Sequence, residues 1–344
     1  MMKHGIACIG STIVDEVLPV IEPGRLTYVD ANKFVSPEEL TGEHVQFSVG
    51  GMATNVSVNL AKLQGNYPLA IFGRIGTDYR AELIVETLKA HHIDMSGVRR
   101  DPDNETSSTE VIHFRLPNGA VERIFRHKLG AMGAFELTDV SLNALASYKI
   151  AMFGYGLLLP QLDLADNTYG TILGRLLAPT QAEGVWTALD FVSPDPQNSF
   201  KFQRYRQTLH YVDILCINED QAGSLTELSK PEDACRALVE IYGARIAVVH
   251  CGAAGPNYAF SESTGLLVQP NIPVSDGECR GNAGAGDAFS AGFLHGMHQE
   301  WPIAKALQFA AAAAAVSLGD ESCTGAMKSE AEVWEFMKVR EDHV

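Results

Sequence analysis

Short apolar runs alternate with segments of helical period along most of the chain. Leu83, Ile84 and Leu88 fall along one stripe of residues 80–92, and this spacing predicts a helix. Continuous apolar runs without polar alternation are typical of strands that are buried on both faces of a parallel sheet. Six such runs occur, at residues 6–9, 69–72, 150–153, 187–191, 214–217 and 246–250. The pattern predicts an α/β fold with a doubly wound, mostly parallel sheet flanked by helices.

Two segments break the α/β pattern and predict a second, smaller sheet. In one of them, alternating strands flank Pro117-Asn118-Gly119, and Asn-Gly between such runs is a strong hairpin signal. We expect this sheet to form a lid over the carboxyl ends of the main strands, where α/β proteins bind ligands; an ordinary surface hairpin is the alternative. The expected division is a large domain of residues 1–14, 48–100 and 129–344 and a small β lid of residues 15–47 and 101–128.

Composition narrows the range of partners. The chain has 344 residues, 46% of them hydrophobic and 20% charged, which is ordinary for a folded protein with a sizeable core. Its formal charge of −16 disfavours nucleic-acid binding through a basic surface. We find no signal-peptide pattern, and the longest small-apolar run, residues 309–316, is too short to cross a membrane. The six scattered cysteines predict buried, reduced thiols in a cytoplasmic protein. We expect no membrane partner.

The sharpest local motif is Gly284-Ala285-Gly286-Asp287, with helical sequence following through His298. A glycine turn that opens a helix presents backbone N–H groups and the positive end of the helix dipole to an anion. In that first turn, Asp287 would accept a proton from a substrate hydroxyl, while the N–H groups of residues 285–287 stabilise a transferring phosphoryl group. Taken alone, the motif fits an Asp-capped helix without a ligand equally well.

Two further motifs offer groups that suit a polyhydroxyl ligand. Gly50-Gly51 opens another helical pattern, and Asn55 in its first turn has both a donor and an acceptor. Asp15 follows the first strand, where a carboxylate accepts two hydroxyl hydrogen bonds; a simple turn residue is the alternative. The dinucleotide-binding and P-loop glycine patterns are both missing from the sequence.

Together these motifs resemble the two signatures of the ribokinase-like (PfkB) carbohydrate kinases. The resemblance rests on Gly50 to Asn55, on Gly73-Arg74-Ile75-Gly76-Thr77-Asp78 and on Gly284 to Asp287, and it covers nearly the whole chain. It implies transfer of the γ-phosphate of ATP, with Mg²⁺, to a primary hydroxyl of a small sugar-like substrate. It also implies that the lid forms the interface of a homodimer.

The resemblance assigns roles to individual residues. Asp287 matches the catalytic base, and the anion hole matches Gly284, Ala285 and Gly286. The implied substrate-binding residues are Asp15, Gly50, Gly51 and Asn55. The implied nucleotide-binding residues are Asn218, Gly252 and Gly255, together with Gly284 and Gly286.

Several positions depart from the family pattern. The motif near the phosphates and metal reads Asn218-Glu219-Asp220-Gln221, so an amide replaces its usual carboxylate and Glu219 is the remaining metal candidate. Gly281-Asn282 replaces the usual Asp-Thr, which leaves a requirement for K⁺ open, and Met52 replaces a lysine common in ribokinases proper. Two alternatives therefore stay open: a nucleoside kinase of the same family, and a catalytically weak ligand-binding regulator on the same fold.

Overall fold

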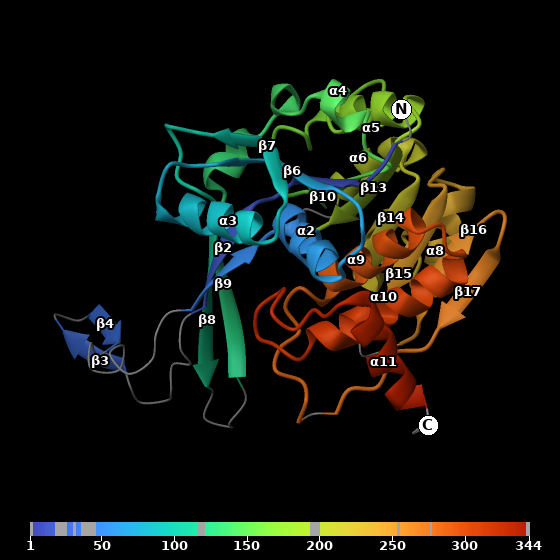
Figure 1. The fold of residues 1–344 in the computed structure, drawn as a ribbon. Helices are drawn as coiled ribbons and strands as arrows, with labels where there is room; N and C mark the ends of the chain where they lie inside the picture. Colours follow the sequence, from blue (N-terminus) through green and yellow to red (C-terminus); the bar gives the residue numbers. More distant parts are fainter. Residues whose placement is uncertain are drawn as a thin grey trace.

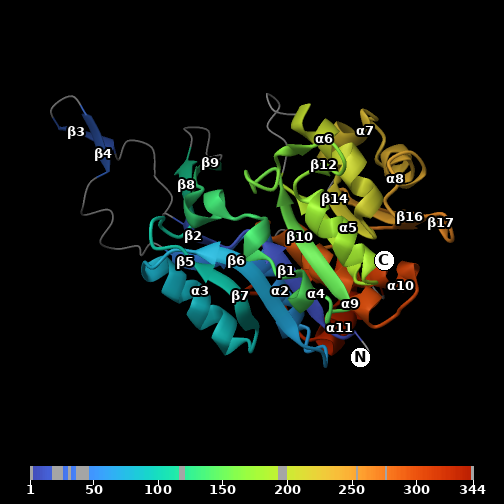
Figure 2. The same cartoon turned by 90° about the horizontal axis from the view of Figure 1, so that it is seen from above.

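A large, mostly parallel sheet forms the centre of the molecule (Figures 1 and 2). The computed structural model describes residues 3–17, 26–29, 32–35, 46–115, 121–192, 200–252, 255–275 and 277–341. The strand order is β17-β16-β15-β14-β13-β10-β1-β6-β7, parallel from β7 to β15 and antiparallel for β16 and β17. The strands are β1 Ile6–Gly10, β6 Leu69–Ile75, β7 Asp94–Arg100, β10 Ile150–Gly156, β13 Trp186–Phe191, β14 Ile214–Asn218, β15 Ile246–His250, β16 Asn257–Ser261 and β17 Gly265–Gln269. All six predicted runs are therefore strands.

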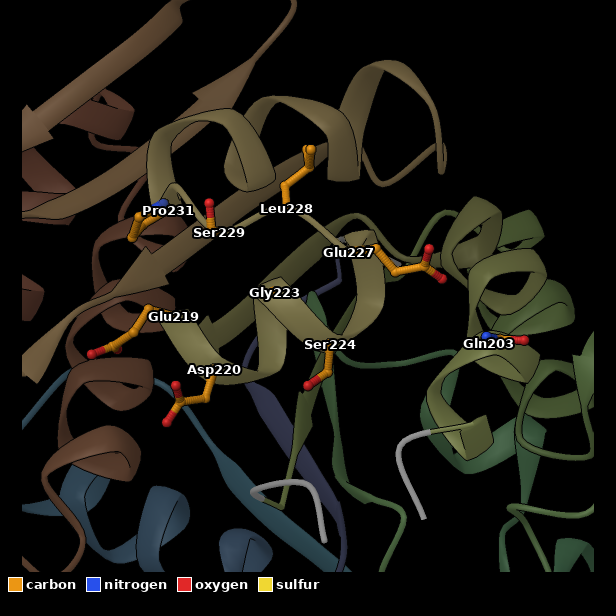
Figure 3. Close-up of a pocket in the computed structure, with 9 residues that line it drawn as sticks. All are labelled: Gln203, Glu219, Asp220, Gly223, Ser224, Glu227, Leu228, Ser229 and Pro231. Carbon is orange, nitrogen blue, oxygen red and sulfur yellow. The ribbon is translucent and has the colours of Figure 1, made fainter. Parts of the chain in front are cut away.

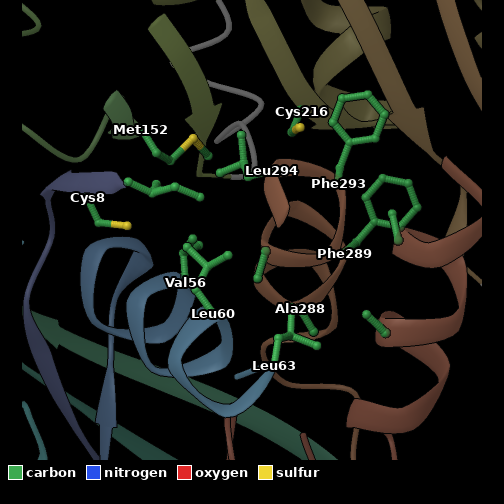
Figure 4. Packing of buried hydrophobic residues seen from close by; sticks show 14 of the residues in the cluster. Cys8, Val56, Leu60, Leu63, Met152, Cys216, Ala288, Phe289, Phe293 and Leu294 are labelled. Atoms are coloured by element: carbon green, nitrogen blue, oxygen red, sulfur yellow. The ribbon is translucent and has the colours of Figure 1, made fainter. Parts of the chain in front are cut away.

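Helices cover both faces of this sheet, as the doubly wound pattern predicted. Side chains alternate between two cores along β1: Ile6 and Cys8 face α2, α3, α9, α10 and α11, whereas Ala7 and Ile9 face α4 to α8. In the first core, α2 packs directly on α9 through residues such as Val56 and Leu294 (Figure 4). The helices are α2 Met52–Lys62, α3 Tyr79–Ala90, α4 Leu142–Leu145, α5 Gly174–Ala182, α6 Phe200–Thr208, α7 Glu219–Thr226, α8 Pro231–Glu240, α9 Ala285–His298, α10 Ile303–Ser317 and α11 Glu330–Glu341, with 3₁₀ turns Gly130–Ala134, Leu137–Asp139 and Leu209–Tyr211.

A smaller four-stranded sheet lies beside the large one, in the order β5-β2-β8-β9 (Figure 1). Its strands are β2 Ile13–Val17, β5 Gln46–Gly50, β8 Ser108–Arg115 and β9 Val121–Lys128. The antiparallel pairing of β8 with β9 agrees with the predicted hairpin, whose Pro117-Asn118-Gly119 turn lies outside the described residues. The other described strands pair in two small sheets: β3 Leu26–Val29 with β4 Asn32–Val35, and β11 Ala165–Asp166 with β12 Gly170–Thr171. The proposed domain boundaries stay predictions.

Two details differ from expectation. Asp15 does not end the first strand: β1 stops at Gly10, and Asp15 lies within β2 of the small sheet. Five cysteines are buried as predicted, but Cys279 is exposed. Within the described part of the chain, none of the helices is both long and apolar enough to cross a membrane.

Candidate active site

The glycine turn at residue 284 opens helix α9. Gly284 has the left-handed conformation, with φ 75°, and a Cβ on it would lie 2.5 Å from the Cβ of Cys323, so no other residue fits there. The helix begins at Ala285, so residues 285–287 form its first turn and include Asp287. The backbone N–H of Ala285 makes only a long contact, 3.5 Å, with the carbonyl of Asn282. The turn therefore presents N–H groups at the positive end of the dipole, as an anion site requires.

The Asp287 carboxylate lies at the junction of three distant segments. The side chain is buried, with 3% of its surface exposed. Asn55 Nδ2, in the first turn of α2, donates to Asp287 Oδ2 at 2.8 Å, and the Tyr155 hydroxyl, in β10, donates to Asp287 Oδ1 at 2.5 Å. The structure thus brings together two residues that the sequence singled out, Asn55 and Asp287, and adds a third that it did not.

The glycine pair before α2 makes room for groups of the chain itself. A Cβ on Gly50 would lie 2.2 Å from Oδ2 of Asp15, and a Cβ on Gly51, whose φ is 81°, would lie 2.5 Å from the carbonyl oxygen of Ser11. The Ser11 hydroxyl, in the loop between β1 and β2, accepts from the backbone N–H of Met52 at 2.9 Å and so satisfies a free N–H at the start of α2. The two glycines thus leave room for atoms of the chain itself, and Asp15 lies beside the opening of α2.

Three carboxyl groups converge on this point. Burial, and then the charge of Asp287, raise the pKa of Asp15 to about 6, while hydrogen bonding to Thr109 lowers it. Burial raises the pKa of Asp287 to about 6, while the bonds from Tyr155 and Asn55 lower it. Asp190, at the end of β13 and 3.5 Å from the Ser290 hydroxyl, has a pKa held well above its ordinary value by burial and by Asp287. Such a cluster suits a ligand that donates hydroxyl hydrogen bonds.

The predicted nucleotide residues lie at the ends of β14 and β15. Asn218 and Gln221 form a reciprocal capping box on α7. The backbone N–H of Asn218 donates to Gln221 Oε1, and the backbone N–H of Gln221 donates to Asn218 Oδ1, each at 2.8 Å. Gln221 is buried and also donates from Nε2 to the carbonyl oxygen of Phe191 at 2.7 Å. The amide in place of a carboxylate therefore has a structural use, since a carboxylate cannot donate to that carbonyl.

Beside it, the turn after β15 approaches the anion site. A Cβ on Gly286 would lie 3.4 Å from Nε2 of His250, whose pKa is lowered to about 4 by burial, so the ring is neutral. Asn271 donates to the carbonyl oxygens of both Gly252 and Gly255, the latter at 2.7 Å. Among the described residues, no atom outside the immediate chain neighbours lies within 4 Å of a Cβ built on Gly252, so this part of the turn is not packed against them.

A pocket of about 520 Å³ borders α7 (Figure 3). Its lining includes the acidic Glu219, Asp220 and Glu227 and none of the groups around Asp287. Glu219 and Asp220 point in different directions from the first turn of the helix (Figure 3). Within the described ranges, no group of three or more His, Cys, Asp or Glu side chains is arranged to hold a metal. Mg²⁺ is commonly held by one or two carboxylates and substrate phosphates, so a single carboxylate is enough, and Glu219 stays a predicted ligand.

Sequence reasoning missed Ser11, Tyr155, Asp190 and Cys323. A weak signal for Asp190 was present, because it is the charged residue near the end of an otherwise uncharged strand sequence. No sequence pattern indicated Tyr155, because its hydrogen-bond partner, Asp287, is 132 residues away.

Comparison with known proteins gives one consistent relationship. The model of the pfkB family carbohydrate kinases matches residues 3–330. The 5-dehydro-2-deoxygluconokinase of Geobacillus kaustophilus is 24% identical over 341 residues, covering 93% of this chain and 94% of the relative. The ribokinase of Arabidopsis thaliana, complexed with ribose and ATP, aligns with TM-score 0.77 and 22% identity over 98% of this chain and 99% of that one. A putative ribokinase II of E. coli, in complex with ATP and Mg²⁺, aligns with TM-score 0.75 and 18% identity over 98% of this chain and 100% of that one. The predicted ribokinase-like fold is confirmed.

Proposed function

The chain belongs to the pfkB family of carbohydrate kinases, which phosphorylate a sugar with ATP, and we propose that Asp287 takes the proton of the primary hydroxyl that is phosphorylated. The observation that supports this role is the position of Asp287 in the first turn of α9. Its carboxylate and the N–H groups of that turn share one place, so a base and an anion site lie side by side.

The groups on the substrate side suit a polyol. Asn55 Oδ1 is buried and has no hydrogen-bond partner among the described residues, so a substrate hydroxyl would satisfy it. The carboxylate of Asp15 would accept from a second hydroxyl. The space beside Gly50 is taken by the Asp15 carboxylate, so glycine at this position lets that side chain lie at the opening of α2. Asp15 and Asn55 thus orient the sugar, and Asp287 faces the hydroxyl that reacts.

The nucleotide would approach from the ends of β14 and β15, along Asn218, Gly252 and Gly255. The hydroxyl oxygen bonds to the γ-phosphorus, the bond to the β–γ bridging oxygen breaks, and the proton passes to Asp287. The N–H groups of residues 285–287, in the turn opened by Gly284, stabilise the charge on the transferring group. Mg²⁺, held by Glu219 and the phosphates, would supply neutralisation of the phosphate charge.

The test is ADP release across hexoses, pentoses, sugar acids and nucleosides, with and without K⁺. Asp287→Asn is expected to lower turnover by about 10²-fold or more while substrate-dependent thermal stabilisation persists. Asp94→Asn, on the exposed start of β7, is the matched control and should match the wild type. An Asp287→Asn enzyme with near-normal turnover would remove Asp287 from the mechanism.

The same panel separates the alternatives. Turnover confined to nucleosides identifies a nucleoside kinase, for which Met52 in place of the ribokinase lysine leaves room. Ligand-dependent stabilisation without ADP release identifies a regulator. We also propose a homodimer through the small sheet, and a cytoplasmic location stays a prediction.

A further inference from the structure

The hydroxyl of Tyr155 makes the shortest contact of the catalytic carboxylate. It lies 2.5 Å from Asp287 Oδ1, whereas Asn55 Nδ2 lies 2.8 Å from Oδ2. The two donors belong to β10 and α2, while Asp287 belongs to α9. Each carboxylate oxygen therefore has its own donor from a different element, and the pair fixes the plane of the group.

The direction of the bond follows from the chemistry of the two groups. Burial raises the pKa of Tyr155 well above its ordinary value, with Asp287 adding to the effect, so the phenol keeps its proton and donates. A donor to a carboxylate favours the ionised form, which opposes the burial of Asp287. An ionised carboxylate is the form that accepts a proton from a substrate.

The hydrogen bond from Tyr155 is important because of the groups that surround Asp287. Among the described residues, no cationic side chain pairs with Asp287. The carboxyls of Asp15, from β2, and Asp190, from β13, face Asp287. So do two thiols whose pKa is raised by burial, Cys8 from β1 and Cys323 from the loop after α10. The neutral imidazole of His250, from β15, lies next to Gly286 on the same side. Apart from the start of α9, its charge therefore depends on neutral donors.

We propose that Tyr155 is the positioning residue of the catalytic base. Its hydroxyl fixes the carboxylate plane and holds Asp287 in the ionised form, which leaves the Oδ2 side, shared with Asn55, for the substrate hydroxyl. This inference rests on the proposed role of Asp287. Tyr155 acts through Asp287 and takes no part in bond making.

The test is the pH profile of kcat for Tyr155→Phe, which removes only the hydroxyl. The acidic limb should move to higher pH by about one unit, since one hydrogen bond to a charged group is lost. KM should change by less than about threefold, because the substrate contacts remain. Tyr67→Phe is the matched control. The Tyr67 hydroxyl contacts Nδ1 of His295, in α9, at 2.9 Å and lies away from Asp287, so the acidic limb of this variant should coincide with that of the wild type.

A folded Tyr155→Phe enzyme whose limb coincides with that of the wild type would overturn the proposal. If that variant does not fold, 3-fluorotyrosine at position 155, a more acidic and stronger donor, should move the limb to lower pH; an unchanged limb would overturn the proposal as well. The Asp287→Asn variant distinguishes a failure of the proposed base from a failure of the proposed role of Tyr155. Full turnover in that variant rejects the base itself, whereas lost turnover with an unmoved Tyr155→Phe limb rejects only the role of Tyr155.

Discussion

The buried carboxyl of Asp287 sets chemistry against stability. Its pKa in the folded protein is about 6, against an ordinary 3.8, with burial as the main cause. A raised folded-state pKa means that the folded protein binds this proton more tightly than the unfolded chain does. The stability contributed by the proton is complete below about pH 3.8 and is lost as the pH rises toward 6. At neutral pH the ionised carboxylate of Asp287 therefore costs stability.

Removing that charge should stabilise the protein at high pH. We expect Asp287→Asn to raise the free energy of unfolding by about 1–2 kcal/mol at pH 8 and to have little effect at pH 4.5. Denaturant unfolding followed by tryptophan fluorescence, at low protein concentration, measures both values. Asp94→Asn, at an exposed position, should change neither. A variant that is less stable than the wild type at pH 8 would contradict the expectation.

Single residues were predictable where their reason is local. The positions of Gly284 and Asp287, in a glycine turn that opens a helix, could be read from a short stretch of sequence, whereas their proposed roles stay predictions. Gly50 and Gly51 stay predicted substrate-binding residues; the atoms nearest to a Cβ built on them belong to Asp15 and Ser11. Tyr155 could not be found, because it reaches Asp287 only when β10 and α9 are in place.

At the scale of elements, the junction of β13, β14 and α7 depends on an amide. Gln221→Glu keeps an acceptor for the N–H of Asn218 and gains about 0.3–1 kcal/mol from a negative charge at the start of a helix. It loses the donor to the Phe191 carbonyl and buries a charge beside it, which costs about 1–3 kcal/mol. The loss outweighs the gain.

We therefore expect Gln221→Glu to lower the melting temperature by a few degrees, measured by scanning calorimetry at pH 8. Gln203→Glu is the matched control, because Gln203 is an exposed glutamine on α6 (Figure 3) and should change little. A melting temperature for Gln221→Glu equal to that of the control would show that the bond to Phe191 contributes nothing measurable.

The elements that sequence reasoning missed lie mostly at edges. The six predicted strands form the centre of the sheet and have continuous apolar runs because both faces are buried. β7 and β17 lie at the two ends of the order, and β7 reads Asp-Met-Ser-Gly-Val-Arg-Arg, which has no such run. The long-range order of strands carried no local signal at all.

At the scale of the whole molecule, the small sheet carries an apolar row on the face that also bears Asp15. The pairing of β2, β8 and β9 aligns Val17, Val111 and Phe125 across three strands, and 58% of Phe125 is exposed. Apolar rows of this kind are commonly covered in an assembly. The same face of a second copy would cover it.

Sedimentation velocity tests this arrangement. The wild type should sediment as a dimer at micromolar concentration, and Phe125→Lys should shift it toward the monomer, because a charge would enter the apolar row. Phe47→Lys is the matched control: Phe47 pairs with Glu16, on the opposite face of the sheet, and its substitution should leave the dimer intact. A monomeric wild type, or a Phe125→Lys dimer as stable as the wild type, would reject the interface.

The hydrogen bond from Asn55 to Asp287 joins residues 232 positions apart. A ribosome delivers α2 long before α9, so during synthesis the side chains of Val56 and Leu60 that later meet α9 lack their partner (Figure 4). An incomplete chain thus leaves apolar surface exposed, the kind of surface that chaperones bind. On the proposed role of Asp287, a chain that stops before α9 also lacks the residue that takes the substrate proton. Activity would then be a sign that translation has passed α9 and that α2 and α9 have met.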